Sequence, residues 1–257
     1  MLSDLYQSII LKNPKKILLL LIVTLISFGY FAKDFRLDAS SETLLIEGDP
    51  DLEYLQEISK RYGSKEFLVL TYTPTEGMIS NTSINNLLSL KYKIQSLDWV
   101  YSVITLLDIP LLSNSDAPLQ ERLEKFKTLK DEDVDRERGF REILSSPVFR
   151  NFVISEDGKT SGIIVNIKKN IPLDNIENKS EDEIEKYKDL IKKQNNENIL
   201  EIRDVIDSYS DIGKIHLGGI PMIADDMMTF IKSDIIVFGI GVFLFIIFTL
   251  WFVFKKL

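Results

Sequence analysis

The stretch that decides the fold is Ile235-Ile-Val-Phe-Gly-Ile-Gly-Val-Phe-Leu-Phe-Ile-Ile-Phe-Thr-Leu-Trp-Phe-Val-Phe254, a run of 20 residues without a charged side chain or a histidine. An α-helix of this length covers ~30 Å at ~1.5 Å per residue, which is the thickness of the hydrocarbon core of a bilayer. The run is apolar on every side, which disfavours the alternative of a core helix in a soluble protein. We therefore predict a transmembrane helix over residues 235–254.

A second apolar run lies near the amino terminus, over residues 17–32. It would cover only ~24 Å, but lysines at both ends can reach toward the membrane surface and lengthen the effective span. A buried soluble helix is one alternative and a cleaved signal peptide is the stronger one. The sequence Tyr30-Phe31-Ala32 places a bulky aromatic residue where signal peptidase requires a small one. The sequence thus favours an uncleaved transmembrane helix over residues 15–33.

Lysines in the short flanking segments predict the orientation of both helices. Lys12, Lys15 and Lys16 precede the first helix, and Lys255 and Lys256 follow the second. Positive residues in short loops are retained on the cytoplasmic side. We expect both termini, including residues 255–257, to be cytoplasmic, and residues 34–234 to form a large domain outside a bacterial inner membrane.

The segment between the two helices is strongly acidic. The chain carries a formal charge of −8, and because the two terminal segments carry +2 each, residues 33–234 carry −12. This charge disfavours nucleic acid and anionic lipid as partners, since both would repel it. The chain contains no cysteine, so the domain must be stable without disulfide bonds.

Apolar residues also follow a helical spacing before the first span. Five of them fall on one helical face within residues 1–14, namely Leu2, Leu5, Tyr6, Ile9 and Ile10. This pattern predicts an amphipathic helix on the cytoplasmic membrane surface, which Pro14 separates from the span.

The first part of the exported segment predicts a β-α-β unit. Asp49 and Pro50 are typical of a helix start, and Gly63 of a helix end. Residues 67–72 and 100–106 are rich in strand-forming residues, and residues 84–97 between them have helical spacing. Residues 110–137 are polar and turn-prone, with a charged helix inside them, and residues 140–144 continue as a helix that Pro147 ends. We expect a boundary between two subdomains within 110–150.

The second part of the exported segment repeats this alternation. Asp157-Gly158 lies between two strand-like runs, residues 152–155 and 160–167, and predicts a β-hairpin. Ser180 and Glu183 form a capping box that opens a charged helix, and a further helical face is marked by Ile199, Ile202, Val205 and Ile206. Residues 215–217 predict a last strand. A helix that starts near Met222 is expected to continue into the second span, and at least four strands are expected in all.

No catalytic constellation is visible in the sequence. His216 is the single histidine and is expected to be an ordinary strand residue, while Gly218 and Gly219 are expected to form a turn. Asp225 and Asp226 would lie just outside the membrane, where they could contact a cation, although solvated carboxylates are the more ordinary interpretation. We expect no enzymatic activity, no cofactor and no metal.

Three separated sequence elements together resemble one transporter family. Lys12-Asn-Pro-Lys-Lys16 precedes the first span; Asp49-Pro-Asp51 and Ile58-Ser-Lys-Arg-Tyr-Gly-Ser64 precede the first strand; and Gly218-Gly-Ile-Pro221, Asp225-Asp226 and Lys232-Ser-Asp234 lead into the second span. Their order and spacing resemble the amino-terminal portion of transporters of the resistance-nodulation-division (RND) superfamily, particularly the MMPL and hydrophobe-exporter branch.

The resemblance implies two spans around a ferredoxin-like α/β domain of the porter type. It implies export of hydrophobic or amphiphilic substrates such as lipids and drugs, with the remainder of a transporter or further copies of the chain as partners. The carboxylates that carry protons in this family belong to later helices, so no such role is transferred to any residue here. A two-span sensor or receptor and a polysaccharide chain-length regulator remain alternatives, although the strand content disfavours the regulator.

Overall fold

The computed structural model describes residues 13–32, 66–112, 126–168 and 180–255, together with 49–51, 54, 57–58 and 61. The predicted amphipathic helix in residues 1–12 and the predicted helix end at Gly63 lie outside these residues. The chain divides into two compact units, residues 1–38 and residues 39–257.

In the first unit, helix α2 (Pro14–Ala32) matches the first predicted span within one residue at each end. Its large apolar side chains are exposed, from 48% at Ile22 to 74% at Leu25. A helix of the core of a soluble protein would bury such side chains, so α2 lacks the burial that this alternative requires.

The second unit is built on a four-stranded sheet. The elements follow one another as β1 (Phe67–Pro74), α4 (Asn81–Gln95), β2 (Val100–Thr105), β3 (Ser161–Ile167), α7 (Glu181–Ser208) and β4 (Gly213–Gly218). The sheet order is β2-β3-β1-β4, and every neighbouring pair is antiparallel. Two β-α-β units interleaved in this way form the ferredoxin-like arrangement. The expectation of an α/β domain with at least four strands is therefore confirmed.

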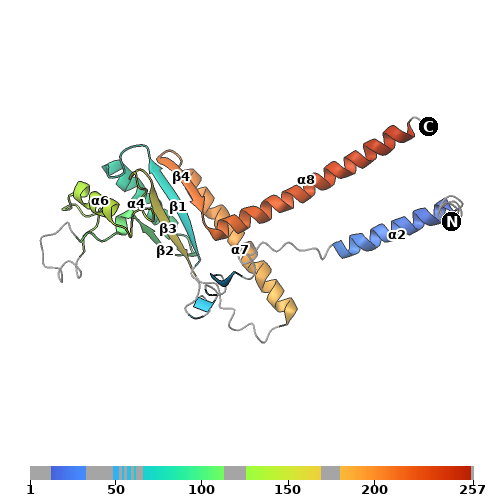
Figure 1. Cartoon of the computed structure of the whole chain (residues 1–257), viewed down its shortest axis with the longest axis horizontal. Helices are drawn as coiled ribbons and strands as arrows, with labels where there is room; N and C mark the ends of the chain where they lie inside the picture. The colour runs from blue at the N-terminus through green and yellow to red at the C-terminus, as the bar shows by residue number, and fades with distance from the viewer. Residues whose placement is uncertain are drawn as a thin grey trace. The chain divides into compact units, whose positions relative to one another are not determined.

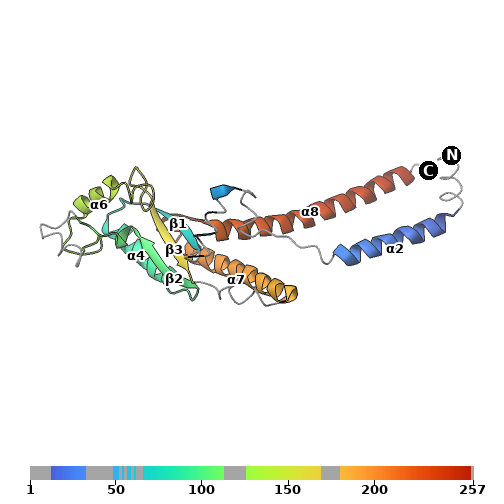
Figure 2. The ribbon, with the colours of Figure 1, turned by 60° about the horizontal axis from the view of Figure 1, so that its bottom comes forward.

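Helices α4 and α7 lie on the same face of the sheet (Figures 1 and 2). Alternate residues of β1 point toward them, so that Leu68, Leu70 and Tyr72 are fully buried whereas Phe67 is 47% exposed. The helices complete this core with residues at helical spacing, which are Ile84, Leu87, Leu90 and Ile94 from α4 and Ile199, Ile202 and Val205 from α7. The predicted faces of both helices are confirmed.

The capping box predicted at the start of α7 is present, and α4 has a cap that was not predicted. Ser80 caps α4 by accepting a hydrogen bond from the backbone N–H of Ser83, and Ser180 and Glu183 form the predicted capping box of α7. Helix α7 continues without interruption for 28 residues, so the charged helix and the apolar face around Ile202 belong to one element. At the earlier predicted helix start, Asp49 accepts a hydrogen bond from the N–H of Asp51.

The predicted hairpin at Asp157-Gly158 is present but short: the N–H of Ser155 donates a hydrogen bond to Thr160 and the N–H of Gly162 donates one to Val153, yet its first arm is not a regular strand. Gly158 has φ of 68°, as a tight turn requires, yet only Ile154 of residues 152–155 forms a bridge, with Ser161. From Ile163 onward β3 already pairs with β1 on one side and β2 on the other. No edge of β3 remains there for a third partner, so the first arm of the hairpin does not extend before Val153.

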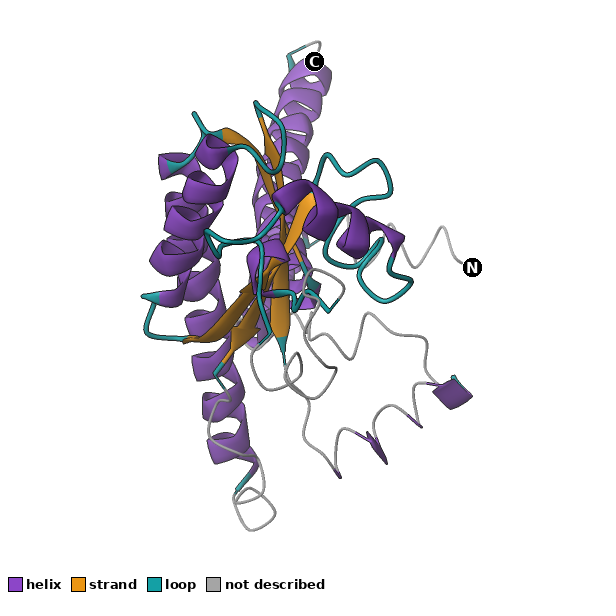
Figure 3. Cartoon of the chain, turned by 90° about the vertical axis from the view of Figure 1, so that its left-hand side faces the viewer, coloured by secondary structure: helices purple, strands orange, loops and turns teal. Residues whose placement is uncertain are grey.

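Residues 126–160 add a small layer beside the sheet that contains α6 (Arg136–Ser145), the helix predicted before Pro147 (Figure 3). Its Ile143 belongs to the same hydrophobic core as β1 and α4. Gly139 fits closely here, because a Cβ on it would come within 2.7 Å of a methyl group of Leu111. The predicted subdomain boundary within 110–150 stays a prediction.

One ion pair is enclosed between α4 and the short helix η2 (Leu106–Asp108). The ammonium of Lys91 donates a hydrogen bond to Asp108, and the two side chains are 11% and 22% exposed. The other carboxylate oxygen of Asp108 accepts two hydrogen bonds from Thr105, one from its backbone N–H at 2.8 Å and one from its hydroxyl at 3.0 Å. Burial opposes ionisation of the Asp108 carboxyl, but the hydrogen bonds from Lys91 and Thr105 outweigh it, so the pKa lies below the ordinary value.

We predict that Asp108→Asn destabilises the domain, because it leaves the Lys91 ammonium enclosed without a counter-charge. We expect a loss of about 2 kcal/mol, less than the ~3–5 kcal/mol for a fully buried pair, because Asp108 retains some solvent contact. Because the pKa of Asp108 is lowered in the folded state, the pair stabilises the fold fully at pH values above the ordinary pKa of a carboxyl group. This stabilisation is lost as the pH falls through the pKa of Asp108 in the folded state. Thermal unfolding of the full chain in detergent, followed by circular dichroism, measures both effects.

Asp133→Asn is the matched control, because Asp133 pairs with Lys127 in an exposed setting, with 68% and 40% of the side chains accessible. Exposed pairs contribute little to stability, so this variant should unfold like the parent chain. Equal unfolding midpoints for Asp108→Asn and Asp133→Asn would contradict the assigned role of the buried pair.

Candidate functional site

The junction between the sheet and the long helix α8 (Ile220–Phe254) is the most tightly specified place outside the core. Strand β4 ends at Gly218, and Gly219 alone separates it from the helix, with φ of 121°. A Cβ on Gly219 would lie 3.0 Å from the backbone oxygen of Phe67 and 3.2 Å from the Cα of Leu68. Only glycine fits this conformation and this space, and Pro221 then supplies a favourable first helical turn.

The turn predicted at Gly218-Gly219 is confined to Gly219, because Gly218 still pairs with Val69 in the sheet, and the helix that follows begins two residues earlier than Met222. Helix α8 is unbroken over 35 residues and includes the whole predicted second span (Figure 1). Within the described part of the chain, residues 220–253 form the one helix long and apolar enough to cross a membrane, and none of its most apolar stretch is buried. The alternative of a soluble core helix lacks that burial.

Three side chains of α7 hold the first two turns of α8. The side-chain amide of Asn195 donates a hydrogen bond of 2.9 Å to the backbone oxygen of Pro221. The amide of Asn196 donates to the Asp225 carboxylate at 3.0 and 3.2 Å. Nη2 of Arg203 contacts both oxygens of Asp226, at 2.8 and 2.9 Å. We call this set the α7–α8 clamp; it comprises Asn195, Asn196, Arg203, Pro221, Asp225 and Asp226.

The clamp corrects one expectation from the sequence. Asp225 and Asp226 are not simply solvated: both are half-buried, and each accepts hydrogen bonds from a different residue of α7. The cation that Asp226 contacts is the guanidinium of Arg203. Because Arg203 and Asp226 remain 43% and 36% exposed, each polar contact contributes modestly. The clamp acts through several contacts together with the covalent turn at Gly219.

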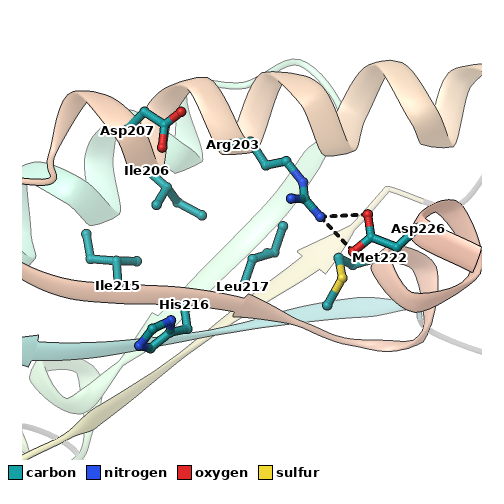
Figure 4. A pocket seen from close by; sticks show the side chains of 8 residues that line it. All are labelled: Arg203, Ile206, Asp207, Ile215, His216, Leu217, Met222 and Asp226. Carbon is teal, nitrogen blue, oxygen red and sulfur yellow. Dashed lines mark hydrogen bonds and ion pairs between the residues drawn. The ribbon is translucent and has the colours of Figure 1, made fainter. Parts of the chain in front are cut away.

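A shallow cavity of ≈ 290 Å³ lies beside the clamp (Figure 4). Its lining residues are Arg203, Ile206, Asp207, Ile215, His216, Leu217, Met222 and Asp226. Figure 4 shows that Ile215 and Leu217 point from β4 toward α7, whereas His216 points to the opposite side of the strand. His216 pairs in register with Thr71 and is exposed. It is an ordinary strand residue, as expected, and it does not face the carboxylate of Asp226.

A second cavity of ≈ 500 Å³ lies at the turn between β1 and α4. The side chains of Met78, Ile79 and Phe140 give it an apolar lining, and Glu76 and Lys159 add one charge of each sign. This volume falls within the range of small-molecule sites. The combination of apolar lining and charged groups suits an amphiphilic molecule.

The first cavity is lined by Asp207, His216 and Asp226, but His216 points to the opposite side of β4 from Asp226. Within residues 13–32, 66–112, 126–168 and 180–255, no group of three or more histidine, aspartate or glutamate side chains is placed to hold a metal ion. The clamp joins a guanidinium to a carboxylate and offers no nucleophile or general base. Its chemistry is that of a structural joint between a domain and a helix.

The three clamp residues of α7 were not found from the sequence. Asn196 and Arg203 are seven residues apart and therefore lie on one helical face, beside the buried stripe of Ile199 and Ile202. This spacing could have indicated a polar stripe facing another element. Which of the acidic residues it faces depends on the path of the chain through Gly219.

No protein-family model matches the chain, and no curated protein matches it either. The assignment of a function therefore depends on the sequence features and the geometry described above.

We predict that the double variant Asn196→Cys with Asp225→Cys is cross-linked by a short bifunctional thiol reagent in the full-length protein. The chain has no cysteine of its own, so any product reports this pair. Asp204→Cys with Asp225→Cys is the control, because Asp204 is exposed and turned by about 100° from its neighbour Arg203. Mobility on a denaturing gel measures the yield. Equal yields for the two pairs would show that α7 and α8 are not held together as described.

Proposed function

We propose that this chain is the amino-terminal segment of an RND-type transporter of the MMPL and hydrophobe-exporter branch, acting in the export of hydrophobic or amphiphilic molecules. The observation that carries the proposal is the direct passage from a ferredoxin-like sheet into an apolar helix of membrane-spanning length through Gly218-Gly-Ile-Pro221. The same residues carry the sequence resemblance to the exit of a porter domain. The fold and the motif therefore support the proposal at one place in the chain.

In this proposal α2 and the later part of α8 both cross the membrane, with the acidic domain outside and both termini in the cytoplasm. The lysines at the outer ends of the two helices support this orientation. The ≈ 500 Å³ cavity near Met78 and Phe140 is the candidate place of contact with an apolar substrate. The acidic surface of the domain would repel the headgroups of anionic lipids, so neutral or cationic amphiphiles are favoured.

The two spans supply no proton relay. Residues 17–32 and 235–254 contain no aspartate, glutamate, histidine, lysine or arginine. Hydroxyl groups such as those of Thr24 and Thr249 have no charge that alternates with pH, and here they donate to the backbone oxygens of Leu20 and Phe245. Energy coupling in such a transporter would come from helices beyond this segment.

A two-span sensor is the second candidate, and the same continuous α8 supports it, because a rigid helix can transmit a domain movement across a membrane. The two candidates differ in what the loss of the chain does to cells. Loss of an exporter segment raises the content of a lipophilic compound directly, whereas loss of a sensor acts through altered gene expression.

We predict that cells lacking this chain accumulate a lipophilic cationic dye faster within minutes, and that transcription inhibitors do not change the difference. Expression of the wild-type chain should restore the original rate. The purified chain alone in liposomes, given a proton gradient, should move no more dye than empty liposomes, because the relay is absent. A difference in cells that transcription inhibitors abolish would contradict the transporter proposal and favour the sensor.

A further inference from the structure

Helix α8 presents an exposed apolar face before it reaches the membrane. Ile220, Ile223, Met227 and Phe230 are spaced three, four and three residues apart, and they are 55%, 46%, 38% and 65% exposed. The α7–α8 clamp occupies a different face of the helix, through Pro221, Asp225 and Asp226. One side of α8 is thus fixed to its own domain, and the apolar face is directed away from it.

Lipid cannot cover the whole of this face. The charge-free run begins at Ile235, so Ile223 lies ~18 Å and Ile220 ~22 Å before it along the helix axis. The interfacial layer on each side of the hydrocarbon core is only ~5–8 Å thick, and a helix tilted by ~40° would still carry Ile220 well beyond it. The start of the face therefore lies in water unless protein covers it.

The same spacing continues into the membrane. Alternating steps of four and three residues from Phe230 lead to Asp234, Val237, Gly241, Leu244, Phe248 and Trp251, which are all exposed. A 3.5-residue repeat is the pattern of helices that pack as a left-handed coiled coil. We call these ten positions, Ile220 to Trp251, the α8 seam.

We propose that α8 mediates parallel self-association, in which the seam of one copy packs against the seam of a second copy of this chain. Identical chains have the same orientation in a membrane, so their α8 helices run parallel and present the same face to a two-fold axis. Eight apolar side chains of the seam are each 38% to 65% exposed. Covering them in both chains buries on the order of 1,000 Å², about half of it removed from water at Ile220–Phe230 and half from lipid at Val237–Trp251, where packing rather than the hydrophobic effect contributes.

Asp234 is the one charged residue of the seam. In a parallel pair the two copies of Asp234 face each other at the membrane boundary, where like charges repel. Self-association is therefore weaker than an uninterrupted apolar seam would give. We therefore expect a neutral residue at position 234 to strengthen the association of the two copies.

The test uses single-cysteine variants of the full chain in bilayers, cross-linked by mild oxidation. Ile223→Cys lies on the seam, and Thr229→Cys is the control, because Thr229 is exposed on the same helix but off the seam. We expect Ile223→Cys to give several-fold more cross-linked dimer, with a yield that does not fall as lipid is added. Similar yields from the two variants, or no dimer from Ile223→Cys, would overturn the proposal.

Asp234→Asn provides a second measurement that does not involve cysteine. Energy transfer between labelled copies should show tighter association than in the parent chain, since the repulsion is removed. Weaker or unchanged association would contradict a parallel seam. Neither result depends on whether the chain belongs to a transporter. Self-association can therefore fail while the proposed function stands, and the proposed function can fail while self-association stands.

Discussion

The turn at Gly219 is the constraint on which the rest of the architecture depends. A single residue at φ 121° connects the edge strand β4 to the 35-residue helix α8, and a side chain there would be strained by this φ and crowded by the backbone of Phe67 and Leu68. The direction of α8 relative to the sheet is therefore set by the chain path itself. The α7–α8 clamp then fixes the rotation of α8 about that direction, because Asn196 and Arg203 must meet two adjacent carboxylates.

The sheet that precedes this turn is stabilised by a core of buried apolar side chains. Leu68, Leu70 and Tyr72 of the central strand β1 are fully buried beneath α4 and α7. The pair of Lys91 and Asp108 adds an enclosed charge interaction that ties α4 to the end of β2. Since α7 contributes both to this core and to the clamp, a movement of α8 at the membrane would be transmitted to the domain through one rigid helix.

Local patterns in the sequence predicted most of the secondary structure, and tertiary competition explains the errors. The capping residues Ser80 and Ser180, the apolar faces of α4 and α7, and the strand at Ile215 were all predictable, because each depends on residues close in sequence. The strand expected over 152–155 is only a short hairpin arm, because β3 pairs on both sides from Ile163 onward, which no local pattern reveals. The α7–α8 clamp could not be predicted for the same reason, because the pairing of Arg203 with Asp226 depends on the turn at Gly219.

We expect the α/β domain and the later part of α8 to move as one body. Electron paramagnetic resonance tests it most directly, with spin labels on Asp204→Cys in α7 and Ile240→Cys in the apolar run, in bilayers and diluted with unlabelled chain to suppress distances between copies. The account predicts one narrow distance distribution that broadens when Arg203 and Asn196 are both replaced by alanine. A broad distance distribution in the labelled chain that still has Asn196 and Arg203 would contradict this rigid connection.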